Sequence, residues 1–326
     1  MVYIDDSIMQ KGSLATAGSK ILENFIAPFD ATVISRLAEK TERVKLAEFG
    51  LSDPGELPGV PLLCNDVFGH VRQRAARQGL CYIRPTYGTV SRYGLIPVAS
   101  SMDQIGVACK NPEEGFSLLG TVAGCDENDG AMFPEKSYRY KAEAKEIKWA
   151  VFIPAATETV PGPEEFIKKA GLKGKMIDCQ VKHAAVFNQV MQILAFAEIS
   201  NNTSRYDGIK FGYRTPKYRN LEELYTKTRT EGFGPEAKLA AIGGCIILSQ
   251  DYYTICYEKA MKVRRLIKES LRFDTYDVIV LPDDNPLAVL AGLPSLTVSY
   301  NGKGVQLAAD VKQENLLLSA WEAVRS

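Results

Sequence analysis

Apolar and polar positions along this chain follow two periods, one typical of strands and one typical of helices. Short apolar runs at 147–154, 277–281 and 295–299 predict buried strands, and residues 81–106 predict strands alternating with turns. A helix is predicted at 111–123, because Pro112 suits a first helical position and apolar residues follow at helical spacing. Further helices are predicted at 30–39, after Gly69, and at 163–170, 181–199, 221–229, 235–271 and 313–325.

Two segments interrupt these patterns and predict loops. Residues 50–61 are rich in Gly and Pro, and residues 125–145 are mostly polar. Strands mixed with long helices favour an α/β fold, with a mixed central sheet and helices on both faces. Since no internal repeat or low-complexity tract divides the chain, we predict a single domain over residues 1–326.

The composition is that of a soluble globular protein, with 46% hydrophobic and 24% charged residues. Lys and Arg together number 39, as do Asp and Glu, so the chain has no net charge that would attract nucleic acid or an anionic membrane. The N-terminus has no apolar stretch, and the apolar run at 240–248 is too short to span a bilayer. We therefore expect a cytoplasmic protein that contacts neither nucleic acid nor membrane.

Cysteine and histidine usage gives no sign of a metal site. The seven Cys form no C-x-x-C pair, which predicts reduced, mostly buried thiols. The two His are His70 and His183, and the second is expected to be a partly buried helical residue. We predict neither a metal nor an organic cofactor.

Several segments match the motifs of one known family in the same order along the chain. Residues 65–106 read NDVFGHVRQRAARQGLCYIRPTYGTVSRYGLIPVASSMDQIG, and they include P-T-Y-G, V-S-R-Y-G-L, A-S-S and D-Q-I-G. Matching blocks also occur at 18–25, 204–208, 230–234, 262–267 and 290–294. On these motifs the chain resembles the amidase-signature family, in particular the A subunits of its glutamyl-tRNA(Gln)/aspartyl-tRNA(Asn) amidotransferases. The resemblance implies a trimmed amidase-signature fold.

The resemblance also places the family's catalytic positions in this chain. The family uses a Lys, a bridging Ser and a nucleophilic Ser, whose hydroxyl is weak until a base removes its proton. The family's I-K-D-N segment corresponds to IDDS here, so Asp5 stands at the Lys position. Its S-D-T-G-G-S segment corresponds to NDVFGH, so Phe68 replaces a Gly and His70 replaces the nucleophile. The Gly- and Ser-rich stretch with the bridging Ser is absent, and the loop at 50–61 stands in its place.

These replacements favour a catalytically degenerate protein that keeps the fold for binding or assembly. One alternative is an amide hydrolase or amidotransferase subunit whose active site is rebuilt around His70. In that case Asp66 or Asp5 would orient the imidazole, or Cys64 or Cys81 would supply a thiol. The other alternative is a binding module that pairs with amidotransferase-type subunits or with itself.

A retained small-molecule pocket would draw on residues of the matched motifs. The charged members of this set are expected mainly to form ion pairs and hydrogen bonds that fix loops to the sheet. The possible pocket comprises Asp66, Phe68, Gly69, His70, Arg72, Arg205, Asp207 and Arg264.

Overall fold

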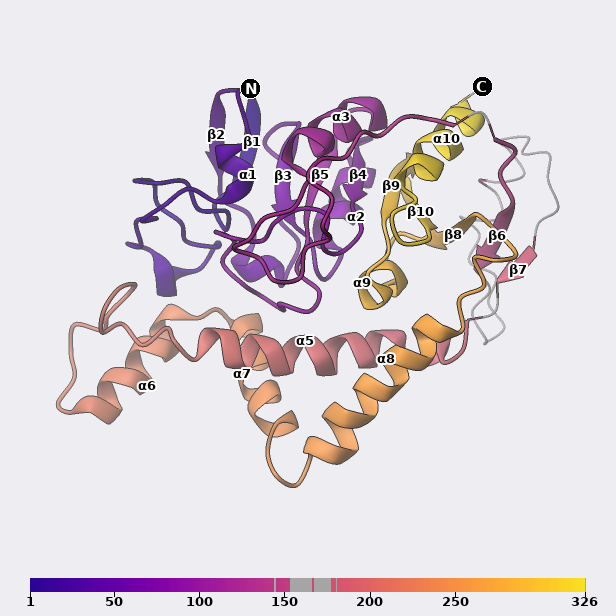
Figure 1. The fold of residues 1–326 in the computed structure, drawn as a ribbon. Helices are drawn as coiled ribbons and strands as arrows, with labels where there is room; N and C mark the ends of the chain where they lie inside the picture. Colours follow the sequence, from indigo (N-terminus) through magenta and orange to yellow (C-terminus); the bar gives the residue numbers. More distant parts are fainter. Residues whose placement is uncertain (144, 153–165, 167–176, 180, 326) are drawn as a thin grey trace.

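The computed structural model describes residues 1–143, 145–152, 166, 177–179 and 181–325. The strands among these residues form a ten-stranded sheet with helices on both faces (Figure 1). The strand order is β2-β1-β3-β5-β4-β9-β10-β8-β6-β7. The α/β fold with a mixed central sheet, which the sequence predicts, is confirmed.

Parallel and antiparallel pairs both occur, which makes the sheet mixed. Near one edge β1 lies parallel to β2 and β3, and near the other β6 lies parallel to β7 and β8. Between these edges β5, β9 and β10 run antiparallel to their neighbours. The strands are β1 (Val2–Asp5), β2 (Thr41–Val44), β3 (Leu62–Asn65), β4 (Cys81–Arg84), β5 (Ile105–Cys109), β6 (Trp149–Phe152), β7 (Ile177–Cys179), β8 (Val278–Pro282), β9 (Ser295–Tyr300) and β10 (Lys303–Ala309).

Helices form a layer on each face of the sheet. α3 and α10 pack on one face, where their apolar side chains share a core with those of the central strands. α2, α5 and α9 lie on the opposite face, and α7 and α8 diverge below α5 in Figure 1. The helices are α1 (Thr32–Ser35), α2 (His70–Arg77), α3 (Pro112–Val122), α5 (Phe187–Thr203), α6 (Leu221–Gly232), α7 (Pro235–Ile247), α8 (Lys259–Glu269), α9 (Leu287–Ala291) and α10 (Glu314–Arg325), with 3-10 turns at Lys20–Leu22, Glu48–Gly50 and Ala184–Val186 and a π-helical turn at Tyr253–Glu258.

Burial on both faces explains the uninterrupted apolar runs of the central strands. In β8, Ile279 and Leu281 face the core beneath α5, whereas Val278 and Val280 face the core beneath α10. Successive side chains of a strand point to opposite faces, so a strand covered on both sides is apolar at every position. The strand predicted at 277–281 is confirmed as β8.

The helix predicted at 111–123 is confirmed as α3. Pro112 occupies its first turn, and the side chain of Asn111 accepts a hydrogen bond from the Glu114 N–H at 2.9 Å. This cap satisfies a donor that the first turn of a helix leaves unpaired. The helices predicted after Gly69, at 221–229 and at 313–325 are confirmed as α2, α6 and α10.

Two other helix predictions are wrong in extent. The helix expected at 30–39 is limited to α1, and the chain continues into β2. The helix expected at 235–271 is broken, because α7 ends at Ile247 and a π-helical turn precedes α8. At the break the Ser249 hydroxyl donates to the Ile246 carbonyl at 2.7 Å, a local bond that competes with the helical pattern.

The remaining predictions differ from the structure in smaller ways. The strand predicted at 147–154 is β6, and the helix predicted at 181–199 begins at Phe187. The prediction omits α9 and the strands β2, β3, β7 and β10. The helix predicted at 163–170 lies outside the described residues, apart from Phe166.

Candidate functional site

The turn between β3 and α2 leads into His70, the residue that the motif resemblance predicts at the family's nucleophile position. Gly69 has a φ of +88°, and a Cβ there would lie 2.5 Å from the guanidinium of Arg72, so only glycine fits. His70 follows as the first residue of α2 and is half-buried, with its ring centroid 6.4 Å from that of Phe68. Among the described residues the imidazole of His70 has no hydrogen-bond partner.

Asp66 and Arg72 hold this turn in place. The carboxylate of Asp66 accepts the backbone N–H groups of Val71 and Arg72 at 3.1 and 3.2 Å, and lies 3.5 Å from the Arg72 guanidinium. Arg72 is 2% exposed, and it donates to the carbonyls of Asp283 and Asn285 at 2.7 and 3.1 Å. The pair therefore caps α2 and ties it to the segment after β8, as the structural interpretation of these charges predicts.

Asp5, which the motif resemblance predicts at the family's Lys position, ends β1 in a buried environment. Its carboxyl accepts a hydrogen bond from the Ser7 hydroxyl. Burial, together with the nearby charge of Asp6, raises the pKa of Asp5 to about 7, although the Ser7 bond acts in the opposite direction. Asp6 turns away to accept from the Thr16 N–H at 3.1 Å and the Gly18 N–H at 3.2 Å.

The described residues contain no hydrogen bond that joins His70 to Asp5 or to Asp66. Both oxygens of Asp66 already accept backbone N–H groups. A histidine base needs a partner that orients its ring, and this structure gives His70 none among those residues.

The two thiols considered as nucleophiles are buried. Cys64 is 0% exposed, and burial raises its pKa well above the usual range. Burial also raises the pKa of Cys81 to about 12. Since the thiolate is the reactive form, both groups are poor nucleophiles in this fold.

The sheet face beneath α2 carries a row of buried polar side chains that the sequence analysis did not single out. Tyr82 in β4 pairs with Thr297 in β9, which pairs with Gln306 in β10. The Tyr82 hydroxyl, the Thr297 hydroxyl and the Gln306 carbonyl oxygen have no hydrogen-bond partner among the described residues. Such groups normally find a partner when they are buried, so this row is an unusual polar patch under the candidate site.

A second set of buried polar residues supports the same turn. Asn65 donates to Asp103 at 2.8 Å and accepts from the Gln104 N–H at 3.1 Å. Arg84 is also fully buried and donates to the Met102 carbonyl at 2.6 Å. Burial raises the pKa of Asp103 and lowers that of Arg84. The sequence signal for this network is a polar or charged residue at an otherwise apolar place. Asn65 and Arg84 lie in buried strands, and Asp103 lies in an apolar segment before β5.

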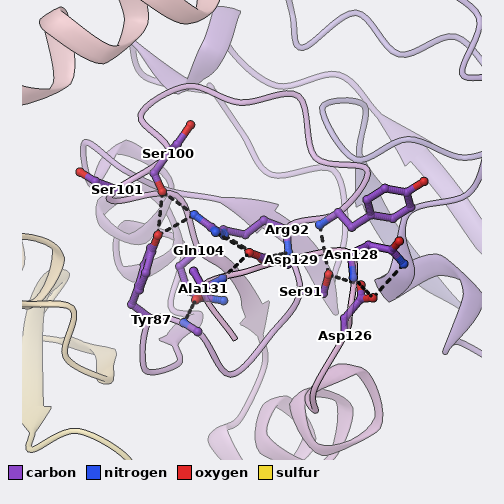
Figure 2. Close-up of polar contacts among 12 residues, drawn as sticks. Tyr87, Ser91, Arg92, Ser100, Ser101, Gln104, Asp126, Asn128, Asp129 and Ala131 are labelled. Atoms are coloured by element: carbon purple, nitrogen blue, oxygen red, sulfur yellow. Dashed lines mark hydrogen bonds and ion pairs between the residues drawn. The ribbon is translucent and has the colours of Figure 1, made fainter. Parts of the chain in front are cut away.

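The V-S-R-Y-G-L motif forms a network of its own, shown in Figure 2. Arg92 donates to the Asp129 carboxylate from its backbone N–H and its Nε, both at 2.9 Å, and to the Tyr87 hydroxyl at 2.6 Å. The Tyr87 hydroxyl donates to the Ser100 carbonyl at 3.0 Å. Burial raises the pKa of Asp129, but the bonds from Arg92 outweigh it and leave the pKa below its usual range. These hydrogen bonds connect the loop that contains Tyr87 and Ser100 to the loop that contains Asp129.

Arg264 lies apart from the turn before α2. Its Nε donates to the Leu290 carbonyl at 2.7 Å, and its two terminal nitrogens donate to the Ser101 hydroxyl and carbonyl at 2.9 and 3.0 Å. It also lines an open groove of about 430 Å³, together with Tyr87 and Gly292. Burial lowers the pKa of this guanidinium.

Arg205 and Asp207 lie in a third place, after α5. Arg205 is exposed and donates to the Asn202 side chain at 3.3 Å. Asp207 accepts from the Ile209 N–H at 2.8 Å and lines a groove of about 610 Å³ with Arg229. The residues proposed as one pocket are therefore distributed over three places, and only Asp66, Phe68, Gly69, His70 and Arg72 lie together.

The described residues contain no group of three His, Cys, Asp or Glu side chains arranged to hold a metal ion. In that part of the chain, no helix is both long and apolar enough to cross a membrane.

The mixed sheet, the β3–α2 turn and the motif networks define an amidase-like protein, and comparison with known proteins agrees. The amidase family model matches residues 62–309, so the chain belongs to the amidase family. It is 33% identical to the A subunit of the glutamyl-tRNA(Gln) amidotransferase of Listeria monocytogenes, over 99% of this chain and 82% of that protein. It is 34% identical to the protein of the same name from Persephonella marina, over 89% of this chain and 70% of that one. The resemblance read from the motifs is confirmed.

Solved structures show the same fold. The A subunit of the glutamyl-tRNA(Gln) amidotransferase of Thermotoga maritima superimposes with a TM-score of 0.73 and 28% identity, over 98% of this chain and 81% of that one. A 6-aminohexanoate cyclic dimer hydrolase reaches a TM-score of 0.77 at 14% identity, which is a likeness of fold alone. The Listeria alignment extends over 396 positions whereas this chain has 326 residues, so segments of that relative have no counterpart here.

Proposed function

We propose that this protein is an amidase-family scaffold that does not hydrolyse amides and acts instead through binding or assembly. The observation that carries the proposal is the occupancy of the family's catalytic positions. His70 replaces the nucleophilic hydroxyl, and Asp5 replaces the base. An amide hydrolase of this family needs a deprotonated hydroxyl, and these positions offer neither the hydroxyl nor the Lys.

The surroundings of these positions support the same conclusion. The carboxyl of Asp5 is bonded to Ser7, and Asp66 is engaged with the first turn of α2. Phe68 stands at one of the two Gly positions that would let backbone N–H groups approach an oxyanion. Its ring packs against the core beneath α5.

Family membership by itself is equally compatible with an amidotransferase subunit that has a rebuilt active site. The feature that favours this second function is His70, whose imidazole is half-buried at the N-terminus of α2 with no partner among the described residues. For this second function, a bound substrate would supply the missing hydrogen bond, because catalytic geometry often tightens only in the complex.

Ammonia release from glutamine, asparagine and simple amides separates the two functions. We expect the purified protein and its His70→Ala variant to release ammonia equally, at the rate of buffer alone. Release by the unmodified protein that disappears in His70→Ala would establish the rebuilt site and overturn the proposal.

We further propose that assembly involves a protein partner. The relatives at about one-third identity bear the name of an amidotransferase subunit, which implies proteins that work within complexes. Co-purification of the tagged chain from native extract is expected to yield a stoichiometric partner or a second copy of the chain. Recovery of the chain alone as a monomer at micromolar concentration would contradict this.

A further inference from the structure

The open groove beside Arg264 is lined by cations and apolar side chains. We call it the α8 groove. Its volume is about 430 Å³, which is within the range of sites that hold small molecules. α8 contributes three cations to its lining, and the described lining residues include no carboxylate. The lining consists of Thr86, Tyr87, Ser101, Ala131, Phe133, Met261, Arg264, Arg265, Lys268, Leu290, Ala291, Gly292 and Val311.

Arg264 carries a largely buried positive charge whose partners are neutral. Its guanidinium donates to the Leu290 carbonyl and to the hydroxyl and carbonyl of Ser101, and it has no ion-pair partner among the described residues. The nearby Glu198 carboxylate is separated from it by the Ser101 hydroxyl, which donates to Glu198 at 2.5 Å. A guanidinium has five N–H groups, so each terminal nitrogen of Arg264 retains one. A buried charge without an opposite charge is costly, and an anion in the groove would offset that cost.

Lys268 lies one helical turn after Arg264 and lines the same groove. Residues four positions apart on a helix have Cβ atoms about 5–6 Å apart, a separation that one carboxylate or phosphate group can bridge. Lys268 is exposed, and in the described part of the chain its ammonium group has neither a hydrogen bond nor an ion pair. It is therefore free to turn toward an anion without breaking an existing contact.

The other charges near the groove are already balanced. Arg265 pairs with Glu269 at 2.7 Å, and Lys312 pairs with Glu135. The carboxylate of Asp310 accepts the backbone N–H of the next residue at 2.8 Å. These three carboxylates do not line the groove. The positive charge available to a ligand thus comes from Arg264 and Lys268.

Two aromatic rings of the lining are held in place by cations. The guanidinium of Arg92 lies 4.9 Å from the ring centroid of Tyr87, and the ammonium of Lys312 lies 4.3 Å from that of Phe133. Cation–π contacts of this kind restrict the ring orientations before any ligand arrives. A wall that is already ordered loses less entropy on binding, which favours a flat apolar ligand group beside it.

We propose that the α8 groove binds a small organic anion that consists of a carboxylate or phosphate group on an aromatic ring. The anionic group lies between Arg264 and Lys268, where charge-assisted hydrogen bonds hold it. The ring packs against Tyr87 and Phe133. This inference does not rest on the proposed function, because the groove lies apart from the turn before α2 and its ligand need not contain an amide.

The test measures binding of benzoate and of phenyl phosphate to the full chain by saturation-transfer NMR. Benzyl alcohol is the neutral analogue with the same ring, and inorganic phosphate is the analogue without a ring. We expect at least one of the two aromatic anions to bind at millimolar concentration, about ten-fold more tightly than benzyl alcohol or inorganic phosphate. The tighter of the two identifies the anionic group. None of the four probes is an amide, so this test and the ammonia test can fail separately.

Lys268→Gln is the principal variant, because it removes the free charge and Gln suits a helix as well as Lys. It is expected to weaken binding of the aromatic anion about ten-fold, whereas Lys268→Arg should retain it. Lys262→Gln is the matched control, since Lys262 is also exposed on α8 and does not line the groove. It is expected to bind as the unmodified protein does. Circular dichroism checks that the variants are folded.

Several results would overturn the proposal. One is that neither aromatic anion binds, or that benzyl alcohol binds as tightly. Unchanged affinity in Lys268→Gln would exclude the groove, and an equal loss in Lys262→Gln would assign binding to surface charge in general. Inorganic phosphate that binds as tightly as phenyl phosphate would show that the apolar wall contributes nothing.

Discussion

A carboxyl group placed where water is excluded prefers its neutral form. Asp5 is in this position, since burial raises its pKa to about 7 from an ordinary value of 3.8. The folded protein therefore holds a proton on Asp5 in a pH range where the unfolded chain releases it. Between about pH 4 and pH 7 the folded state binds more protons, so the free energy of unfolding falls as the pH rises.

Replacing Asp5 by Asn removes this dependence, because the amide cannot ionise. We expect Asp5→Asn to be more stable than the unmodified protein at pH 7.5, by about 2–4 kcal/mol. The two should have nearly equal stability at pH 4. Urea unfolding at a series of pH values measures the difference, and a difference that does not change with pH would contradict the assigned environment of Asp5.

The unpartnered hydroxyl of Thr297 gives a second prediction at the residue scale. Thr297→Val keeps the shape of the side chain and removes a buried polar group that has no partner among the described residues, so it should stabilise the protein by about 1 kcal/mol. Thr89→Val is the control, because the equally buried hydroxyl of Thr89 donates to the Thr86 carbonyl at 2.8 Å. It should destabilise by a similar amount. Equal losses in both variants would indicate that Thr297 has a partner.

Sequence motifs identified the residues of the turn but not their surroundings. The resemblance predicts family positions for Asp5 and His70, because the neighbouring residues match. The partners of Arg72 could not be predicted in the same way. They are carbonyl groups of Asp283 and Asn285, more than 200 positions away, and any residue type supplies a carbonyl.

At the scale of elements, α2 is held at its first turn by Arg72. Arg72→Met removes every donor of that side chain and leaves Asp66 without its buried cation, so we expect a loss of about 3–5 kcal/mol in the free energy of unfolding. Arg77→Met on the same helix is the control. The Arg77 side chain is 53% exposed and lies 3.7 Å from Asp53, so its loss should cost less than about 1 kcal/mol. Similar losses in both variants, measured by urea unfolding, would contradict the anchoring role of Arg72.

Elements whose signals are local were predicted well, and those that depend on competing signals were not. The cap of α3 is encoded in adjacent residues, Asn111 and Pro112. The break after α7 depends on Ser249, a residue also common within helices. One local signal was overlooked: β10 was missed although Asn301 and Gly302, both with positive φ, form a two-residue turn of the favoured kind after β9.

At the scale of the whole molecule, one sheet joins distant parts of the chain. β1 and β2 lie near one edge, whereas β9 and β10, from the C-terminal part, lie at its centre (Figure 1). Composition and periodicity predicted this class of fold because both faces of the strands are apolar. They could not predict the strand order, which depends on contacts between distant segments.

A continuous sheet supports our proposal that the chain is a single domain. We expect one unfolding transition in urea, with the same midpoint by circular dichroism and by the fluorescence of Trp149 and Trp321. Trp149 lies in β6 and Trp321 in α10, so they report on the part of the sheet far from β1. Two separate transitions would show that the chain contains independent folding units.

The central claim is that this amidase-family protein lacks amide hydrolysis, and glutamine turnover at high protein concentration tests it most directly. Ammonia would be followed for hours, with an asparaginase on asparagine as the positive control for detection. The account predicts no release above that of buffer, by the unmodified protein or by His70→Ala. Sustained release by the unmodified protein that His70→Ala abolishes would contradict the claim and would place a working active site at the start of α2.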